Sequence, residues 1–123
     1  MADSPYPFAA GQLLAQSRPV VDTVTTLFTA KLRTEVTVIR VCNVAPSVRT
    51  FRIFHDDSGT SVPSYSSDKA LYYDATVPIG GTIVISALSP NTGIILKKNG
   101  ALGVRSDLAS ALVFSAYGVA QQI

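Results

Sequence analysis

The most regular alternation of hydrophobic and polar residues lies between Thr34 and His55. Its first half, TEVTVIRVCN, is rich in β-branched residues, and in its second half Phe51 and Ile53 flank Arg52. This period of two is typical of β-strands with one buried face. The turn-forming residues between the halves, in NVAPS, predict a hairpin whose first strand is central in a sheet.

Similar runs recur along the rest of the chain, separated by residues that favour turns, and no stretch has convincing helical periodicity. These further predicted strands are 21–30, 70–77, 82–88, 94–98, 102–105 and 111–120. Asn99-Gly100 predicts a type I′ hairpin turn between two of them. The pattern therefore predicts an all-β fold, a single antiparallel β-sandwich of about eight strands with jelly-roll or immunoglobulin-like connectivity.

The first 20 residues do not follow this pattern. They contain three prolines and a glycine, which disfavour a helix or a central strand. We therefore expect residues 1–20 to form an extended arm before a sandwich domain at 21–123. Such an arm either lies across a neighbouring subunit or is a frayed terminus.

Composition places the chain among small single domains that do not need disulfides. Hydrophobic residues make up 47% of its 123 residues and charged residues only 15%, which suggests that partner chains cover part of its surface. The net charge of +2 contains no basic run longer than Lys97-Lys98, so no nucleic-acid partner is expected. No apolar run reaches the roughly 18 residues of a membrane helix, so no membrane partner is expected. The amino terminus lacks signal-peptide features.

The segment that begins at His55 raises two possibilities, a catalytic dyad and a calcium site. His55 meets carboxylates at Asp56 and Asp57, but no serine elbow accompanies them, so a turn after a strand is favoured over a catalytic dyad. Oxygens of Asp56, Asp57, Ser58 and Thr60 do not have the spacing of a calcium loop. We therefore expect no enzymatic activity, metal or cofactor.

The single cysteine, Cys42, lies in a strand pattern and is expected to be a buried hydrophobic residue and not a nucleophile.

Aromatic and apolar side chains suggest a binding function in place of a catalytic one. Tyrosines on or beside loops stack on sugars or anchor protein interfaces, although cross-strand packing is the commoner use. The candidate interaction residues are the large apolar side chains of the arm and the tyrosines around the 70–77 strand: Tyr6, Phe8, Leu13, Leu14, Tyr65, Tyr72 and Tyr73.

Several segments carry a resemblance: TLFTA, TVIRVCN, RTFRIFHDDSGT, ALYYDATVPIGGTIVI, GIILKKNGALGVRS and ALVFSAYGV. Together they resemble a group of small structural proteins of tailed bacteriophages. Members show a threonine-rich first strand, an apolar strand ending in CN or VN, a strand similar to FRI, and LxVRS before an aromatic strand. The resemblance covers about residues 23–120, without the arm or the loop around Tyr65.

The resemblance implies a non-enzymatic component of the virion, assembled in the host cytoplasm. We expect a capsid cement or decoration protein, a homo-oligomer with a trimer favoured, whose arm clamps neighbouring subunits of the major capsid protein. One alternative is an adaptor of the tail, neck or baseplate. Another is a carbohydrate-binding module that holds surface glycans through its tyrosines.

Overall fold

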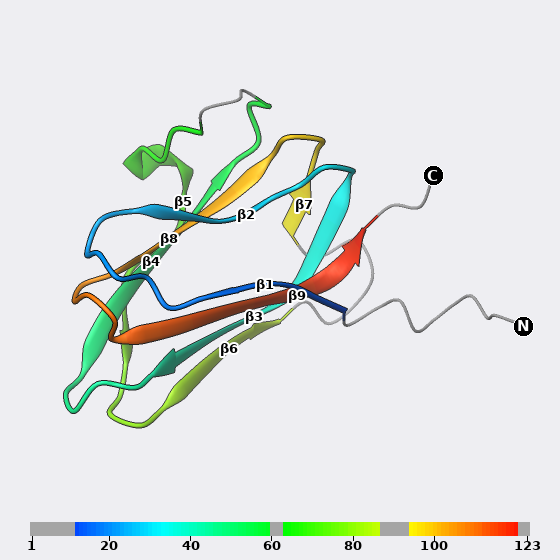
Figure 1. The fold of residues 1–123 in the computed structure, drawn as a ribbon. Helices are drawn as coiled ribbons and strands as arrows, with labels where there is room; N and C mark the ends of the chain where they lie inside the picture. The colour runs from blue at the N-terminus through cyan, green and yellow to red at the C-terminus, as the bar shows by residue number, and fades with distance from the viewer. Residues whose placement is uncertain (1–11, 60–62, 87–93, 121–123) are drawn as a thin grey trace, which may run out of the picture.

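The computed structural model describes residues 12–59, 63–86 and 94–120, which form two antiparallel sheets packed face to face (Figure 1). Sheet A has the order β1 (Gln12–Ser17), β9 (Leu112–Ala120), β3 (Thr34–Asn43) and β6 (Thr82–Ser86), and β7 (Ile94–Leu96) also pairs with β3. Sheet B has the order β2 (Thr25–Thr29), β8 (Ala101–Ser106), β4 (Arg49–Asp56) and β5 (Ala70–Val77). A short 3₁₀ turn, η2 (Ser67–Lys69), precedes β5. The predicted all-β antiparallel sandwich is confirmed, and the described residues add one strand, β1, to the eight predicted.

The pairing of the strands identifies the topology. With β6 and β7 counted as one interrupted strand, β1 pairs with β9, β2 with β8, β3 with β6 and β7, and β4 with β5. This nested pairing is that of a long hairpin rolled into two sheets, which is the jelly roll. An immunoglobulin-like sandwich keeps its first two strands in one sheet, whereas β1 and β2 lie in different sheets here.

The predicted hairpin between residues 34 and 55 was wrong. β3 belongs to sheet A and β4 to sheet B, so residues 44–48 cross from one sheet to the other. Both strands turn apolar residues into one core, Ile39 from β3 and Ile53 from β4, but from opposite sides. Alternation and turn residues are the same for a hairpin and for such a crossing, so the sequence pattern does not distinguish them. The central position of β3, between β9 and β6, is confirmed.

The turn at Asn99-Gly100 also differs from the prediction. The Gly100 amide donates to the Lys97 carbonyl at 2.8 Å, and Asn99, the third residue of the turn, has a φ of 69°. Lys98 is not among the described residues with positive φ, so the turn is of type II and not of type I′. It joins β7 to β8, which lie in different sheets.

Part of the predicted arm is a strand of the sandwich. β1 pairs along β9, and its Leu14 and Ala15 pack against the core. The Ser110 amide then donates to the Pro19 carbonyl at 2.8 Å, which fixes the chain just after β1. The predicted boundary at residue 20 therefore does not follow the structure. The part of the arm before β1 lies outside the described residues.

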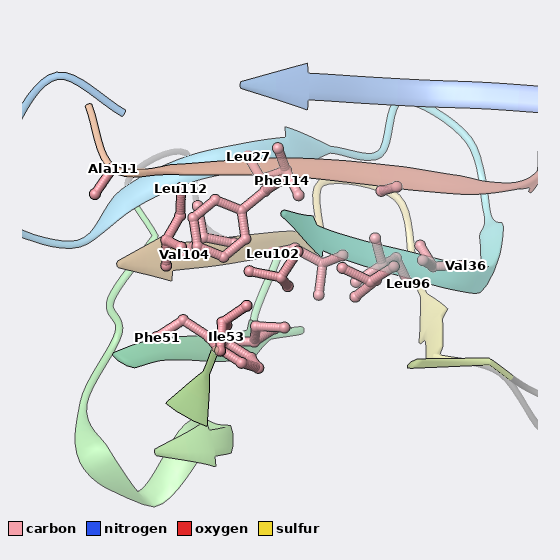
Figure 2. Close-up of a cluster of buried hydrophobic side chains, with 14 of the residues drawn as sticks. Leu27, Val36, Phe51, Ile53, Leu96, Leu102, Val104, Ala111, Leu112 and Phe114 are labelled. Atoms are coloured by element: carbon pink, nitrogen blue, oxygen red, sulfur yellow. The ribbon is translucent and has the colours of Figure 1, made fainter. Parts of the chain in front are cut away.

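The core lies between the sheets and is filled from both (Figure 2). Phe114 of β9 points toward Phe51 of β4, with ring centroids 6.3 Å apart and planes at 71°. Edge-to-face contact of this kind adds to the stabilisation from burying two large rings. Close approach of β9 to β3 requires a glycine at 118, because a methyl group there would collide with the carbonyl oxygen of Glu35.

Asn43, at the end of β3, links two crossings between the sheets. Its buried amide nitrogen lies within hydrogen-bond distance of the carbonyl oxygens of Ser47, Val77 and Pro78, at 2.8, 3.1 and 3.2 Å. Its Oδ1 accepts a hydrogen bond from the Ala45 amide at 2.9 Å. One side chain thus holds the β3–β4 connection against the end of β5.

We expect Asn43→Ala to lower the free energy of unfolding by about 2–3 kcal/mol, because buried carbonyl groups would lose their donor. Urea denaturation measures the change. Val44→Ala, which alters the exposed neighbour, should stay within about 0.5 kcal/mol of the parent. Equal midpoints for Asn43→Ala and the parent would contradict this role.

Candidate functional site

Among the predicted site residues that the structure describes, the exposed aromatic side chains lie on β5, the edge strand of sheet B. Leu71, Tyr72 and Tyr73 are 43%, 37% and 52% exposed. Edge strands have unpaired backbone groups on one side and invite contact with other chains. We call these three residues, with Arg52 and Asp74, the β5 patch.

Two irregularities in the β4–β5 pairing shape this patch. The register shifts between the pairs Phe51–Ala75 and Ile53–Tyr72, and shifts again before the next pair, so β5 carries extra residues opposite β4. Asp74 lies in the first shift with a φ of 57°, a left-handed conformation that aspartate tolerates. Such bulges twist an edge away from regular strand pairing and re-aim side chains. The patch is therefore built to present side chains and not to accept an added strand.

Arg52 and Asp74 hold the patch in one arrangement. The Arg52 Nε donates to Asp74 Oδ1 at 2.7 Å and its terminal nitrogen donates to Oδ2 at 3.1 Å, a two-pronged contact. The guanidinium carbon lies 3.8 Å from the centre of the Tyr73 ring. The hydrogen bond to Arg52 lowers the pKa of Asp74, and the same contact raises the pKa of Arg52. Tyrosine and arginine are the residue types that most often dominate binding energy at interfaces.

Tyr65 is half-buried and makes its contacts within the protein. Its hydroxyl lies 2.7 Å from the Thr26 hydroxyl, and its ring lies 6.1 Å from the ring of Phe54. The ring covers Gly103, where a methyl group would lie 2.8 Å from three ring atoms. Burial raises the pKa of the Tyr65 hydroxyl. Tyr65 therefore fastens the loop before β5 to the outer face of sheet B, away from any free stacking surface.

The four candidates from the predicted arm do not form one cluster in the described residues. Leu13 is exposed, whereas Leu14 is half-buried against the core. Tyr6 and Phe8 lie outside the described residues.

Tyr72 contacts both the core and the solvent. Its ring lies 5.9 Å from the core ring of Phe51, and more than a third of the residue is exposed.

The geometry around His55 does not form the hydrogen-bonded histidine–carboxylate pair of a catalytic dyad. Its Nε2 lies 3.9 Å from Asp57 Oδ1, too far for a hydrogen bond, and has no hydrogen-bond partner among the residues that the structure describes. Asp57 Oδ1 instead accepts a hydrogen bond from the Lys97 amide at 2.8 Å. The predicted turn after β4 accounts for both residues.

Asp56 is engaged within the protein. Its carboxylate is buried and accepts hydrogen bonds from the Ser58 and Ser64 amides and from Lys69 Nζ, at 3.1, 2.8 and 3.1 Å. The Ser64 amide, above all, lowers the pKa of Asp56 well below its ordinary range. Lys69 Nζ thus already binds Asp56 Oδ1, an oxygen that the considered calcium site would need as a ligand.

Within residues 12–59, 63–86 and 94–120, no three histidine, cysteine or acidic side chains are grouped as metal ligands. The same residues contain no helix of the length and hydropathy needed to cross a bilayer. Cys42, predicted to be buried, is half-buried. Its cross-strand partners, Val113 and Thr82, are themselves half-buried and exposed, which places Cys42 on the outer side of β3.

Comparison with known proteins found no protein-family model, curated protein or solved structure that matches this chain.

Sequence reasoning found two of the five residues in the β5 patch, Tyr72 and Tyr73. It missed Leu71, Arg52 and Asp74. The available signal was the aspartate in YYDA, since aspartate is unusual inside a strand and marks a bulge.

Proposed function

We propose that this chain is a non-enzymatic structural protein of a phage virion, a capsid cement or decoration protein that binds the major capsid protein. The observation that carries the proposal is the β5 patch, an exposed aromatic and arginine surface on a bulged edge of a small jelly roll. The resemblance to tailed-phage structural proteins supports the choice of partner. Its place is then the virion, assembled in the host cytoplasm.

The β5 patch suits a binding role for a physical reason. Arg52 is held by Asp74 and stacked on Tyr73, so little side-chain freedom remains to be lost when a partner binds. A capsid offers the same partner surface in many copies, so contacts of modest strength become strong when several subunits are engaged together.

The test is co-sedimentation of the purified chain with capsids that lack it. Leu71→Ser with Tyr73→Ser removes two exposed anchors without touching the core, and we expect at least a tenfold weaker affinity. Leu108→Ser, an equally exposed apolar residue in the β8–β9 connection, is the matched control and should bind as the parent does.

A second variant tests the arm. Deletion of residues 2–11 removes Tyr6 and Phe8 while β1 stays in place, and we expect it also to weaken capsid binding. Normal decoration of capsids by both variants would contradict the proposal. Binding to purified tails and not to capsids would favour the adaptor of the tail, neck or baseplate.

A carbohydrate-binding module is the second candidate, favoured by the exposed Tyr73 ring. Arg52 already occupies one face of that ring, and the ring of Tyr65 packs over Gly103 on the outer face of sheet B, which leaves few free aromatic faces for sugars. Binding to a glycan array that is lost with Tyr73→Ala would support this candidate, and an array without signal would exclude it.

A further inference from the structure

The edge strands of the two sheets differ in how they are protected against pairing with other chains. β1, β2 and β5 each have a register shift against the neighbouring strand, and β5 also carries Asp74. β7 has only three residues. Bulges, charges and short length are the usual protections of an edge. Among the described edge strands, only β6 combines five residues in unbroken register with the absence of charge and proline (Figure 1).

The pairing of β6 with β3 shows which of its backbone groups point away from the sheet. The Asn43 amide donates to the Gly81 carbonyl at 3.0 Å. In an antiparallel ladder such hydrogen-bonded pairs recur at every second residue, so Ile83 and Ile85 also bond to β3. The alternate residues have their amide and carbonyl groups on the other side, where the described residues contain no further strand: Thr82, Val84 and Ser86.

The side chains of β6 suit an added strand. Ile83 and Ile85 pack against the core. Val84, between them, is on the outer side and is 53% exposed. β-branched residues of this kind favour strand pairing. The free edge therefore has backbone donors and acceptors around an apolar centre.

This edge is complementary to itself. A twofold axis at Val84, perpendicular to sheet A, places Val84 opposite the partner's Val84 and Thr82 opposite the partner's Ser86. Outward groups then meet outward groups at all three positions, which gives about six hydrogen bonds between the copies. Each contact occurs twice, as an isologous interface requires.

We propose that β6 is a self-association edge, on which a second copy pairs its own β6 in antiparallel orientation and joins the two A sheets into one. Because the axis is perpendicular to this joined sheet, both copies turn the outer face of sheet B in the same direction. The two β5 patches then lie on one side of the dimer. The twofold dimer departs from the trimer that the resemblance implies, and its formation does not depend on what the β5 patch binds.

The short edge makes the dimer weak. Five residues at about 3.3 Å, in a layer about 10 Å thick, give roughly 170 Å² per copy in projection. This area is far below that of stable interfaces, so directional hydrogen bonds, and not area, fix the arrangement. Arg40 lies on β3 opposite Val84, so the two copies of Arg40 are three strand widths apart, roughly 14 Å, a distance at which salt screens their repulsion. The dimer is therefore expected at high concentration and should dissociate on dilution.

Sedimentation velocity on the full chain, from about 10 μM to about 1 mM, tests the proposal. We expect a monomer–dimer equilibrium. Val84→Pro should raise the dissociation constant at least tenfold, because it removes an amide donor at the centre of the new pairing. The fold should tolerate this proline, since the Val84 amide does not bond to β3. Circular dichroism checks that the variant is folded.

A pair of charged variants tests the twofold axis itself. Val84→Lys and Val84→Glu, each alone, should weaken the dimer at least tenfold, because like charges then lie directly opposite each other. An equimolar mixture of the two should associate at least tenfold more tightly than either alone. Val20→Lys, an exposed valine in the β1–β2 connection, is the control and should leave the equilibrium unchanged. A monomer at every concentration, or a dimer that neither Val84→Pro nor the charged variants change, would overturn the proposal.

Discussion

We expect a chain that lacks residues 2–18 to lose cooperative folding, while a chain that lacks residues 2–11 unfolds like the parent. The longer deletion removes β1, so that β9 becomes the edge strand of sheet A and pairs only with β3. It also removes Leu14 from the core margin and the hydrogen bond from Gln16 Nε2 to Ser115 Oγ at 2.9 Å. On the order of five ladder hydrogen bonds, at about 1 kcal/mol each, are lost with them. That sum is comparable to the total stability of a small domain.

Thermal unfolding followed by circular dichroism separates the two deletions. The shorter deletion should keep a sharp transition within a few degrees of the parent, whereas the longer one should show none or one at far lower temperature. If both chains unfold cooperatively at the parent's temperature, β1 is not part of the sandwich body. The comparison also shows why a capsid-binding test of the arm must stop at residue 11.

The second large effect is expected at Asp56. Asp56→Ala should lower the free energy of unfolding by about 2–4 kcal/mol, because two backbone amides and Lys69 lose their acceptor. Only 2% of Asp56 is exposed, so water does not replace the carboxylate easily. Asp68→Ala in the same loop is the control, since that side chain is exposed and should cost less than about 0.5 kcal/mol.

The effect of Asp56 should depend on pH with a definite sign. Its pKa is lowered in the folded protein, so its contribution to stability is fully present above the unfolded-state pKa of about 4. The contribution is lost as pH falls from there toward the folded-state pKa. The difference in stability between the parent and Asp56→Ala should therefore be constant from about pH 7 to 5 and shrink below about pH 4. A difference that grows in acid would contradict the assignment.

The sequence predicted the strands well and their partners poorly. Alternation in residues 34–43 and 49–56 marks strands because a half-buried strand needs period two wherever its partner lies. The partners of β3 and β4 depend on which side of the core each strand fills, which is decided by the whole chain. β1 was missed for a related reason: QLLAQS has no clean alternation, and its partner β9 lies about a hundred residues away.

The site was predicted in part. The exposure of Tyr72 and Tyr73 follows from the position of β5 at the edge of sheet B. The sequence placed both tyrosines in a predicted strand beside a loop but did not indicate that this strand lies at an edge. The role of Arg52 depends on the bulge at Asp74, a feature of register that composition does not reveal. The polar loop around Tyr65 predicts a free interaction residue, whereas Gly103 on β8 leaves room for its ring to pack against sheet B.

The most direct test of a cement role is to count this chain in the virion. Phage particles produced in cells that express this chain would be purified, separated into capsids and tails, and analysed by quantitative mass spectrometry. The account predicts the chain in the capsid fraction, in a fixed ratio to the major capsid protein and in many copies per particle. Its absence from purified particles, while it is abundant in the infected-cell lysate, would contradict the account.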